Sequence, residues 1–181
     1  TKGTIKKATD FPSSKSELIY TGPLFYMGNP LNKTPRQVCT QNSHYDVLDL
    51  ETMSETYLPR SNFLPACSAE VYRARAPIVA WSSETSVPDL QVIECYRHAN
   101  REMITPVGER TLVSAIIPPG TSHVHTVLSN AFRSVGDLLD FHSLALSVPI
   151  DYRVKSTGAT HANPSLIAQL PLPPKELPVE L

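Results

Sequence analysis

The 181-residue sequence has little glycine and no long hydrophobic run. With only seven glycines, no pair has the spacing of a G-x-G-x-x-G or G-x-x-x-x-G-K phosphate-binding loop, so neither nucleotide-binding motif is present. No apolar stretch approaches the roughly 18 residues that a membrane-spanning helix needs, so we expect no membrane partner. The chain is 41% hydrophobic and 18% charged, which indicates a folded domain with a real core and not a disordered segment.

Net charge is also nearly absent. Lys and Arg number 16 and Asp and Glu number 17, so the formal net charge is −1. A protein that coats nucleic acid is normally strongly basic. Any contact of this chain with nucleic acid must therefore use a local basic patch and not the overall field.

Cysteine is scarce as well. Cys39, Cys67 and Cys95 are odd in number, and none lies within four residues of another. This spacing argues against a disulfide framework and against a zinc ribbon. Reduced thiols fit a cytoplasmic protein.

Proline, by contrast, is abundant, with 17 residues that punctuate the chain into short elements. Residues 1–17 are polar and lysine-rich and predict a flexible N-terminal segment, followed by a single domain over residues 18–181. The first half of that domain predicts a strand entering a turn at 18–27, a loop at 28–37, a short strand at the start of 38–50, and irregular chain over 51–81 with one helical turn at 69–75.

The second half has stronger periodicity. Pro88 suits the first position of a helix, and a helix over 88–105 is predicted from apolar residues at helical spacing, namely Val92, Cys95, Tyr96, Ala99 and Met103. Residues 110–120 predict a buried strand and 121–128 a second strand or extended segment. Residues 150–156 predict either a strand or a helix.

Two further helices have clear start signals. Ser134 and Asp137 form a capping box, and an apolar helix follows that we expect in the core, with Leu138, Leu139, Phe141, Leu144 and Ala145. Leu139→Ala is then expected to cost roughly 2–5 kcal/mol. Asn163 before Pro164 predicts the cap of a short helix that ends near Gln169. Together these elements predict an α+β fold with a mixed, partly antiparallel sheet and two main helices.

Few side chains suggest catalysis or metal binding. His123 and His125 share a face if they lie on a strand, but a metal needs a third ligand, and only Asp137 and Asp140 are near. Ser43, His44 and Asp46 are the residue types of a nucleophilic triad. Neighbours on a strand point to opposite faces, however, and a G-x-S-x-G elbow is absent. We therefore predict no catalytic, metal or cofactor site in this chain.

Three loops are rich in lysine, arginine, amide and hydroxyl side chains, which hold phosphates and read base edges. Ordinary surface loops have a similar composition, and composition alone favours that interpretation. The candidate side chains lie in residues 29–36, 41–44 and 153–163.

Several motifs in the second half occur together and in order. An arginine-led strand of the form R-T-L-x-x-A-x-I-P-P-G spans 110–120, and a leucine-rich helix leads into Asp151-Tyr152. A G-x-T-H-x-N element covers 158–163, and Q-L-P-x-P-P covers 169–174. In this order they resemble the target-recognition domain of adenine-specific DNA methyltransferases, in the type II restriction–modification enzymes and the methylases of bacterial phage-defence islands. Residues 25–50 are also similar to a segment of the defence-island methylases.

The resemblance implies a target-recognition-domain-like fold and a role in reading DNA sequence. The family's catalytic Asn/Asp-Pro-Pro-Tyr/Phe tetrapeptide is absent, because Asn29-Pro30 is followed by Leu31. The chain is thus expected to be the recognition portion of a larger adenine-specific methyltransferase and not to methylate DNA alone. Its expected partners are double-stranded DNA and the catalytic domain of the parent chain, which binds S-adenosylmethionine. The alternative is a protein–protein scaffold domain of a defence complex, which the near-neutral charge favours.

Within this interpretation, the loop at 157–163 and the loop around Lys33 and Arg36 are expected to face the duplex. Gly158 permits a tight backbone, and Pro164 starts a helix whose amide groups can hold a phosphate. The predicted DNA-contacting residues are Lys33, Arg36, Asn42, His44, Lys155, Thr157, Thr160, His161 and Asn163.

Overall fold

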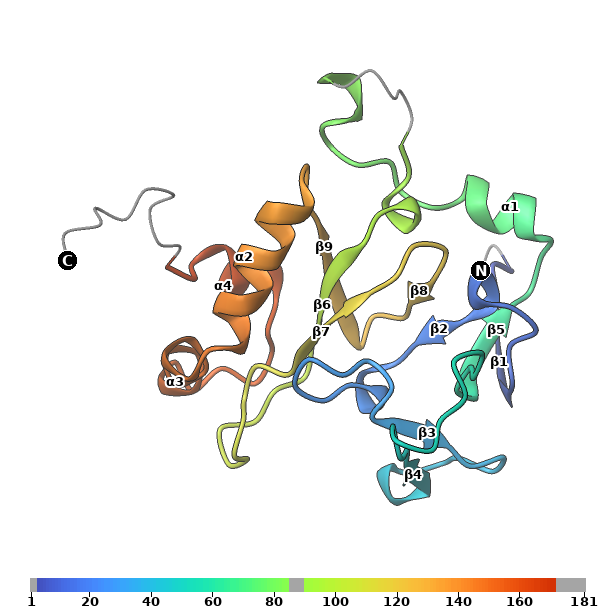
Figure 1. Ribbon diagram of the computed structural model, residues 1–181, viewed down its shortest axis with the longest axis horizontal. Helices are drawn as coiled ribbons and strands as arrows, with labels where there is room; N and C mark the ends of the chain where they lie inside the picture. Colours follow the sequence, from blue (N-terminus) through green and yellow to red (C-terminus); the bar gives the residue numbers. More distant parts are fainter. Residues whose placement is uncertain (1–2, 85–89, 172–181) are drawn as a thin grey trace.

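A three-stranded antiparallel sheet, β7-β6-β9, lies at the centre of the computed structural model, which describes residues 3–84 and 90–171 (Figure 1). The fold is α+β. The strands are β1 (Ile5–Asp10), β2 (Ile19–Tyr20), β3 (Lys33–Pro35), β4 (Tyr45–Val47), β5 (Ser61–Pro65), β6 (Arg97–Arg101), β7 (Ser114–Ile117), β8 (Ser122–His123) and β9 (Val127–Ala131). The helices are α1 (Ala69–Ala74), α2 (Val135–Leu146), α3 (Val148–Ser156) and α4 (Pro164–Ala168). None of the helices in these ranges is long and apolar enough to cross a membrane.

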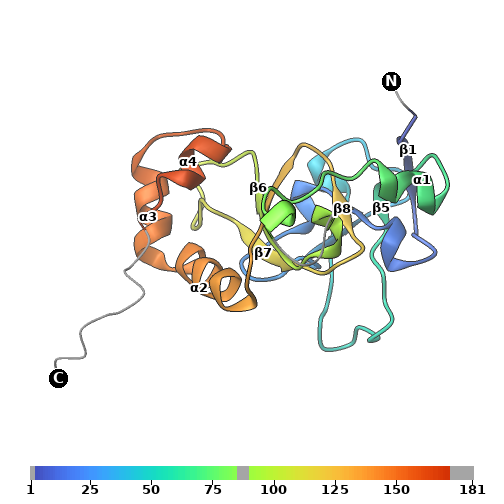
Figure 2. The same cartoon turned by 90° about the horizontal axis from the view of Figure 1, so that it is seen from above.

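The central sheet separates two layers. Helices α2, α3 and α4 lie on one side, and the two-stranded sheets β1-β5, β2-β8 and β3-β4 lie on the other (Figures 1 and 2). Each layer has its own core. The core toward the small sheets contains Leu18, Tyr20, Leu24, Phe25, Ala99, Val113, Ala115, Ile117 and Val127. The core among the helices contains Ile104, Leu112, Ala145, Ile150, Val154, Ala162, Ile167 and Leu170.

The prediction of a helix over residues 88–105 is wrong for the residues from 90 onward. Pro88, its predicted first residue, lies outside the described residues. This segment instead forms a short 3-10 turn and then β6, which pairs antiparallel with β7 on one edge and β9 on the other. The apolar residues that suggested a helix do not share a face, because Ala99 is fully buried whereas Met103 is 67% exposed. Hydrogen bonds from two neighbouring strands therefore override the local helical pattern.

The helix predicted after Ser134 is confirmed as α2. The Ser134 hydroxyl accepts a hydrogen bond from the Asp137 amide at 3.0 Å, which is the N-cap bond of the predicted capping box. Leu138 is buried, but the prediction that Leu139 lies in the core is wrong, because its side chain is 50% exposed. Successive helical residues are rotated by about 100°, so only one of the two leucines faces the sheet.

The rest of the second half follows the sequence more closely. The strand predicted at 110–120 is present as the shorter β7, and residues 121–128 contribute β8 and the start of β9. The ambiguous segment 150–156 is helical, within α3. Asn163 caps α4, since its side-chain oxygen accepts from the Leu166 amide at 2.9 Å.

One buried carboxylate joins α3 to the segment before β7. Asp151 is 4% exposed, and its Oδ1 accepts hydrogen bonds from the amides of Thr111 and Leu112, both at 2.8 Å. Its Oδ2 lies 3.5 Å from Nε of Arg110, and the Nη2 of that arginine donates to the Leu146 carbonyl at 2.6 Å. The R-T-L motif and the Asp-Tyr motif of the sequence thus meet in one buried polar contact.

The first half departs more from expectation. Residues 5–10 fall in the segment predicted to be flexible, but they form β1 and pair with β5, a strand in a stretch predicted to be irregular. The loop predicted at 28–37 contains β3, and the strand predicted at the start of 38–50 lies later, as β4. The paired residues of β1 and β5 lie more than 50 positions apart in the sequence, so neither strand carries a local signal of the other. The strand and turn expected at 18–27 are confirmed as β2 with a following 3-10 turn, and the helical turn expected at 69–75 as α1.

Two buried histidines join β6 to α2. Nδ1 of His98 lies 3.0 Å from Nδ1 of His142, so one ring donates and the other accepts a hydrogen bond. His98 is fully buried, and desolvation, followed by the nearby His142, lowers its pKa to about 3. Desolvation also lowers the pKa of His142. Both rings are therefore neutral at pH 7.

This pair predicts a loss of stability in acid. The unfolded chain protonates His98 below about pH 6.5 and the folded chain only near pH 3, so the free energy of unfolding falls as pH falls through this window. At pH 5 the loss from His98 alone is about 2 kcal/mol relative to pH 7. Urea unfolding at both pH values measures it. His98→Asn, whose amide takes the place of Nδ1 but does not titrate, is expected to reduce the pH 7 to pH 5 difference by that amount; an unchanged difference contradicts the assignment.

Candidate functional site

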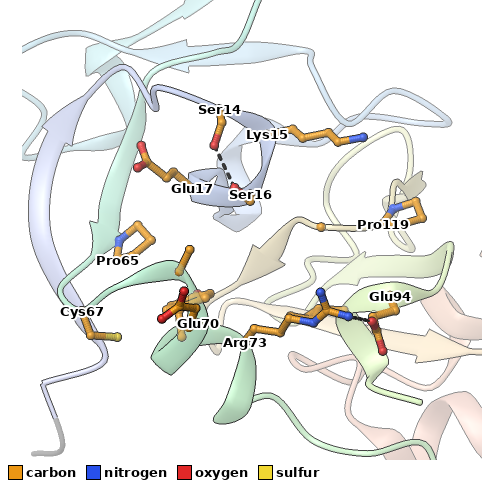
Figure 3. Close-up of a pocket in the computed structure, with 14 residues that line it drawn as sticks. Ser14, Lys15, Ser16, Glu17, Pro65, Cys67, Glu70, Arg73, Glu94 and Pro119 are labelled. Atoms are coloured by element: carbon orange, nitrogen blue, oxygen red, sulfur yellow. Dashed lines mark hydrogen bonds and ion pairs between the residues drawn. The ribbon is translucent and has the colours of Figure 1, made fainter. Parts of the chain in front are cut away.

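One hollow of the surface, which we call the N-terminal cavity, has a volume of about 600 Å³ and lies between the turn at 14–17, the end of β5 and α1 (Figure 3). Lys15 lines it together with Glu17 and Glu70, and Arg73 forms an ion pair with Glu94 (Figure 3). The charges are of both signs. None of the residues predicted to contact DNA lines this cavity, and its acidic groups make it a poor surface for a polyanion.

A second hollow of about 400 Å³, which we call the hairpin pocket, does contain predicted residues. Lys33 and Asn42 both line it. Its lining residues in the described chain include two cations and no acidic side chain; they are Gly22, Pro23, Lys33, Asn42, Tyr45, Arg101, Met103 and Thr126. An acid-free pocket with lysine, arginine and amide groups has the chemistry that attracts a phosphate or a base edge.

One wall of the hairpin pocket is the β3–β4 hairpin. Lys33 pairs with Val47 in the ladder, and the Arg36 amide donates to the His44 carbonyl at 2.9 Å, which closes the hairpin around the turn that carries Asn42. Lys33 has no ion-pair partner within the described residues. Its ammonium group is therefore available to an anionic ligand.

The opposite wall is the end of β6. Nε of Arg101 donates to the Gly22 carbonyl at 2.8 Å, and burial lowers the pKa of this arginine below its usual value. Glycine suits position 22 because the Cβ of any other residue would lie only 3.1 Å from the Thr126 carbonyl oxygen, which is a tight contact. The Gly22 amide also donates to the Thr126 hydroxyl at 3.1 Å. Backbone and arginine thus hold this wall in place without a bound ligand.

The loop at 157–163 pairs with the segment that carries Met103, a residue that lines the same pocket. The Ile104 amide donates to the Thr160 carbonyl at 3.0 Å, and the Ala162 amide donates to the Glu102 carbonyl at 2.7 Å. These bonds bridge Met103, which lines the pocket, to His161. Met103 therefore links the pocket that contains Lys33 and Asn42 to the loop at 157–163.

Two predicted side chains of this loop, Thr160 and His161, are exposed. The Thr160 hydroxyl lies 3.0 Å from Nδ1 of His161, and Nε2 of His161 lies 3.8 Å from a Glu102 carboxylate oxygen. Gly158 has φ +66°, the left-handed conformation that its place in a tight turn predicts. The exposed Thr160–His161 pair is linked to the pocket by Met103, which pairs with His161 and lines the pocket.

The other predicted residues mostly bond within the fold. Arg36 donates to a carboxylate oxygen of Asp46 through two nitrogens, at 2.8 and 2.9 Å, and these hydrogen bonds lower the pKa of Asp46. Nζ of Lys155 donates to the Gly108 carbonyl at 2.8 Å, and the Thr157 hydroxyl donates to the Val154 carbonyl at 2.7 Å.

His44 and Asn163 are likewise engaged. Nε2 of His44 contacts the Gln41 amide at 3.0 Å, and Asn163 caps α4 as described above. The structure thus leaves Lys33, Asn42, Thr160 and His161 as the predicted residues best placed to meet a ligand.

The histidines considered as metal ligands are not brought together with acids. His123 contacts the Ser129 hydroxyl through Nε2 at 2.8 Å, and His125 is exposed. Within residues 3–84 and 90–171, no three His, Cys, Asp or Glu side chains are close enough to hold a metal ion. The three cysteines are free thiols.

Arg101 is the functional candidate that sequence reasoning missed. Arg101 lies in the segment that the sequence predicts to be a helix, and R-H-A-N-R has no clear alternation of apolar and polar residues that would reveal a strand.

The motifs that carry the family resemblance map mainly to structural contacts. Arg110 and Asp151 meet in the buried contact, and Asn163 caps a helix. Pro173 and Pro174, which end the last motif, lie outside the described residues. Comparison with family models, curated proteins and solved structures finds no match to this chain.

Proposed function

We propose that this chain is the DNA sequence-recognition portion of an adenine-N6 DNA methyltransferase or restriction–modification enzyme, whose catalytic domain is not in this chain. The observation that carries the proposal is the hairpin pocket. Its described lining is free of acids and holds Lys33 and Asn42, and its lining residue Met103 pairs with the exposed His161.

The chemistry of the pocket suits a duplex. Lys33 supplies a mobile point charge for a phosphate, and the partly buried Arg101 on the other wall adds a fixed positive potential. Asn42 offers the amide that forms two hydrogen bonds to adenine in the major groove. A hollow lined by charges of one sign concentrates the field, which compensates for the chain's net charge of −1.

In this proposal the catalytic domain of the parent chain binds S-adenosylmethionine and receives the adenine after it is flipped out of the duplex. The recognition portion holds the rest of the site in register. The setting is a bacterial cytoplasm and the biological role is defence against phage.

The alternative is a scaffold domain that binds protein and not DNA. The near-neutral charge favours it, as do exposed apolar side chains on the helical layer, such as Val148 at 69% and Tyr152 at 70% exposure. Salt dependence separates the two, because binding to a duplex weakens steeply between low and moderate salt through counterion release.

Lys33→Ala is expected to weaken binding to all duplexes alike and to reduce the slope of log K against log salt by about one. Asn42→Ala is expected to relax the preference at one base position by roughly 1–3 kcal/mol. Fluorescence anisotropy with labelled duplexes at several salt concentrations measures both, in this chain and in the parent enzyme.

The matched control is Arg36→Ala combined with Asp46→Ala. This double variant removes a charge pair whose sum is zero from the same hairpin, so the salt slope should stay unchanged. Unaltered affinity and slope after joint replacement of Lys33, Asn42, Thr160 and His161 contradicts the proposed interface.

A further inference from the structure

A third hollow, which we call the Arg97 cavity, lies at the other end of β6. Its volume is about 450 Å³, and none of the predicted DNA-contacting residues lines it. Arg97 is one of its lining residues even though only 2% of its surface is exposed to solvent. Arg97 is therefore the most buried charged residue among those that line the cavity.

Arg97 is a buried cation without a carboxylate partner among the described residues. Nη2 donates to the Thr121 carbonyl, and Nε has no hydrogen-bond partner. Burial is the main cause that lowers its pKa, to about 10, and the ionisable groups that act on it are Cys95, Tyr20 and Tyr72. At pH 7 these three are neutral and Arg97 remains charged.

An uncompensated buried charge is costly, and proteins normally pair it or let it bind a ligand. The unpartnered Nε of the buried Arg97 is therefore evidence that this residue binds an anion. The lining residues of the cavity in the described chain contain no acid that could serve instead.

The walls offer further hydrogen-bonding groups. The Tyr72 hydroxyl lies 2.5 Å from the Ser122 hydroxyl, and Nδ1 of His123 lies 3.1 Å from the Val124 carbonyl. That carbonyl accepts from Nδ1, so Nε2 accepts from the Ser129 hydroxyl at 2.8 Å. Hydroxyl groups that now bond to each other and to a neutral histidine can turn toward an oxyanion.

We propose that the Arg97 cavity binds a phosphate group, carried either by a small phosphate compound or by a nucleic-acid strand. Apolar side chains such as Pro77 and Leu128 line the remainder of the space, which leaves room for more than the phosphate itself. The site is separate from the hairpin pocket. Arg97 and Arg101 are four positions apart on β6, which is about 13 Å along a strand.

Thermal unfolding of the full chain with inorganic phosphate and with a nucleoside monophosphate tests the proposal. At about a hundred times its Kd, the ligand should raise Tm by roughly 5–10 °C, with chloride at equal ionic strength as the reference. Arg97→Gln should abolish this rise. If that variant does not fold, Ser129→Asp serves in its place, because its carboxylate occupies the cavity and should likewise remove the response to phosphate.

Arg133→Gln is the control, since Arg133 is an exposed arginine that pairs with Glu84 and does not line the cavity. It should keep the full rise in Tm. No rise with either ligand, or an equal rise in all variants, overturns the proposal.

Duplex binding then identifies the source of the phosphate. Weaker duplex binding by the cavity variants, together with competition by inorganic phosphate, assigns the group to DNA. Unchanged duplex binding, or none at all, alongside a phosphate response that depends on Arg97 assigns it to a small compound. The second result supports the cavity even where the proposed DNA-recognition function fails.

Discussion

Asp151→Ala is expected to lower the free energy of unfolding by about 3–5 kcal/mol. The substitution leaves the amides of Thr111 and Leu112 without their acceptor in a buried position. It also removes the carboxylate beside Arg110, whose side chain is largely buried. Unsatisfied buried donors and an unpaired buried charge are among the few causes of such large losses.

Urea unfolding followed by circular dichroism measures the loss. Asp151→Asn keeps an oxygen that can accept from the two amides and removes only the charge, so it should cost less than the alanine variant. Asp140→Ala, an exposed acid on α2, is the control and should cost about 0.5 kcal/mol or less. Equal losses for Asp151→Ala and Asp140→Ala contradict the structural role of the carboxylate.

The second large effect separates two adjacent leucines. Leu138→Ala is expected to cost about 2–5 kcal/mol, because Leu138 is 3% exposed on the face of α2 that meets the sheet. Leu139→Ala is expected to cost about 1 kcal/mol or less, because half of its side chain is already in water.

The two variants make the same chemical change in the same helix, so the helix propensity of alanine cancels between them. The same urea experiment compares them directly. A larger loss for Leu139 than for Leu138 means that the helix is rotated relative to the sheet.

Local signals predicted the elements that depend on local interactions. The caps of α2 and α4 were predictable, because Ser134 and Asn163 bond to amides only three residues away. The prediction that Leu139 is buried is wrong because an apolar run indicates that a helix is buried but does not indicate which side faces the sheet.

Strands that depend on distant partners were missed. Nothing near β1 announces β5, and β6 is held by β7 and β9 on either edge. Its residues Arg97, His98 and Asn100 are polar and buried, which no hydrophobic pattern detects.

The candidate site was predicted in part for the same reason. Lys33 and Asn42 stand in a loop sequence of suitable chemistry, and they line the hairpin pocket. Arg101 could not be found, because its place beside them depends on the pairing of β6. The partners of Arg36 and Lys155 could not be foreseen either, since they come from the opposite strand of the hairpin and from a separate loop.

The position of β6 between two strands has a consequence for quality control of the folded protein. Alternation along β6 puts Arg97 and Arg101 on one face and His98 and Asn100 on the other. A slip of one residue in the pairing register of β6 would exchange the two faces. Both arginines would then point into the core among the helices, and neither pocket would form. A preparation with this error would keep its secondary structure and its mass, so circular dichroism would not detect the error. Titration with a ligand of either pocket would instead measure the fraction of molecules in which β6 has the correct register.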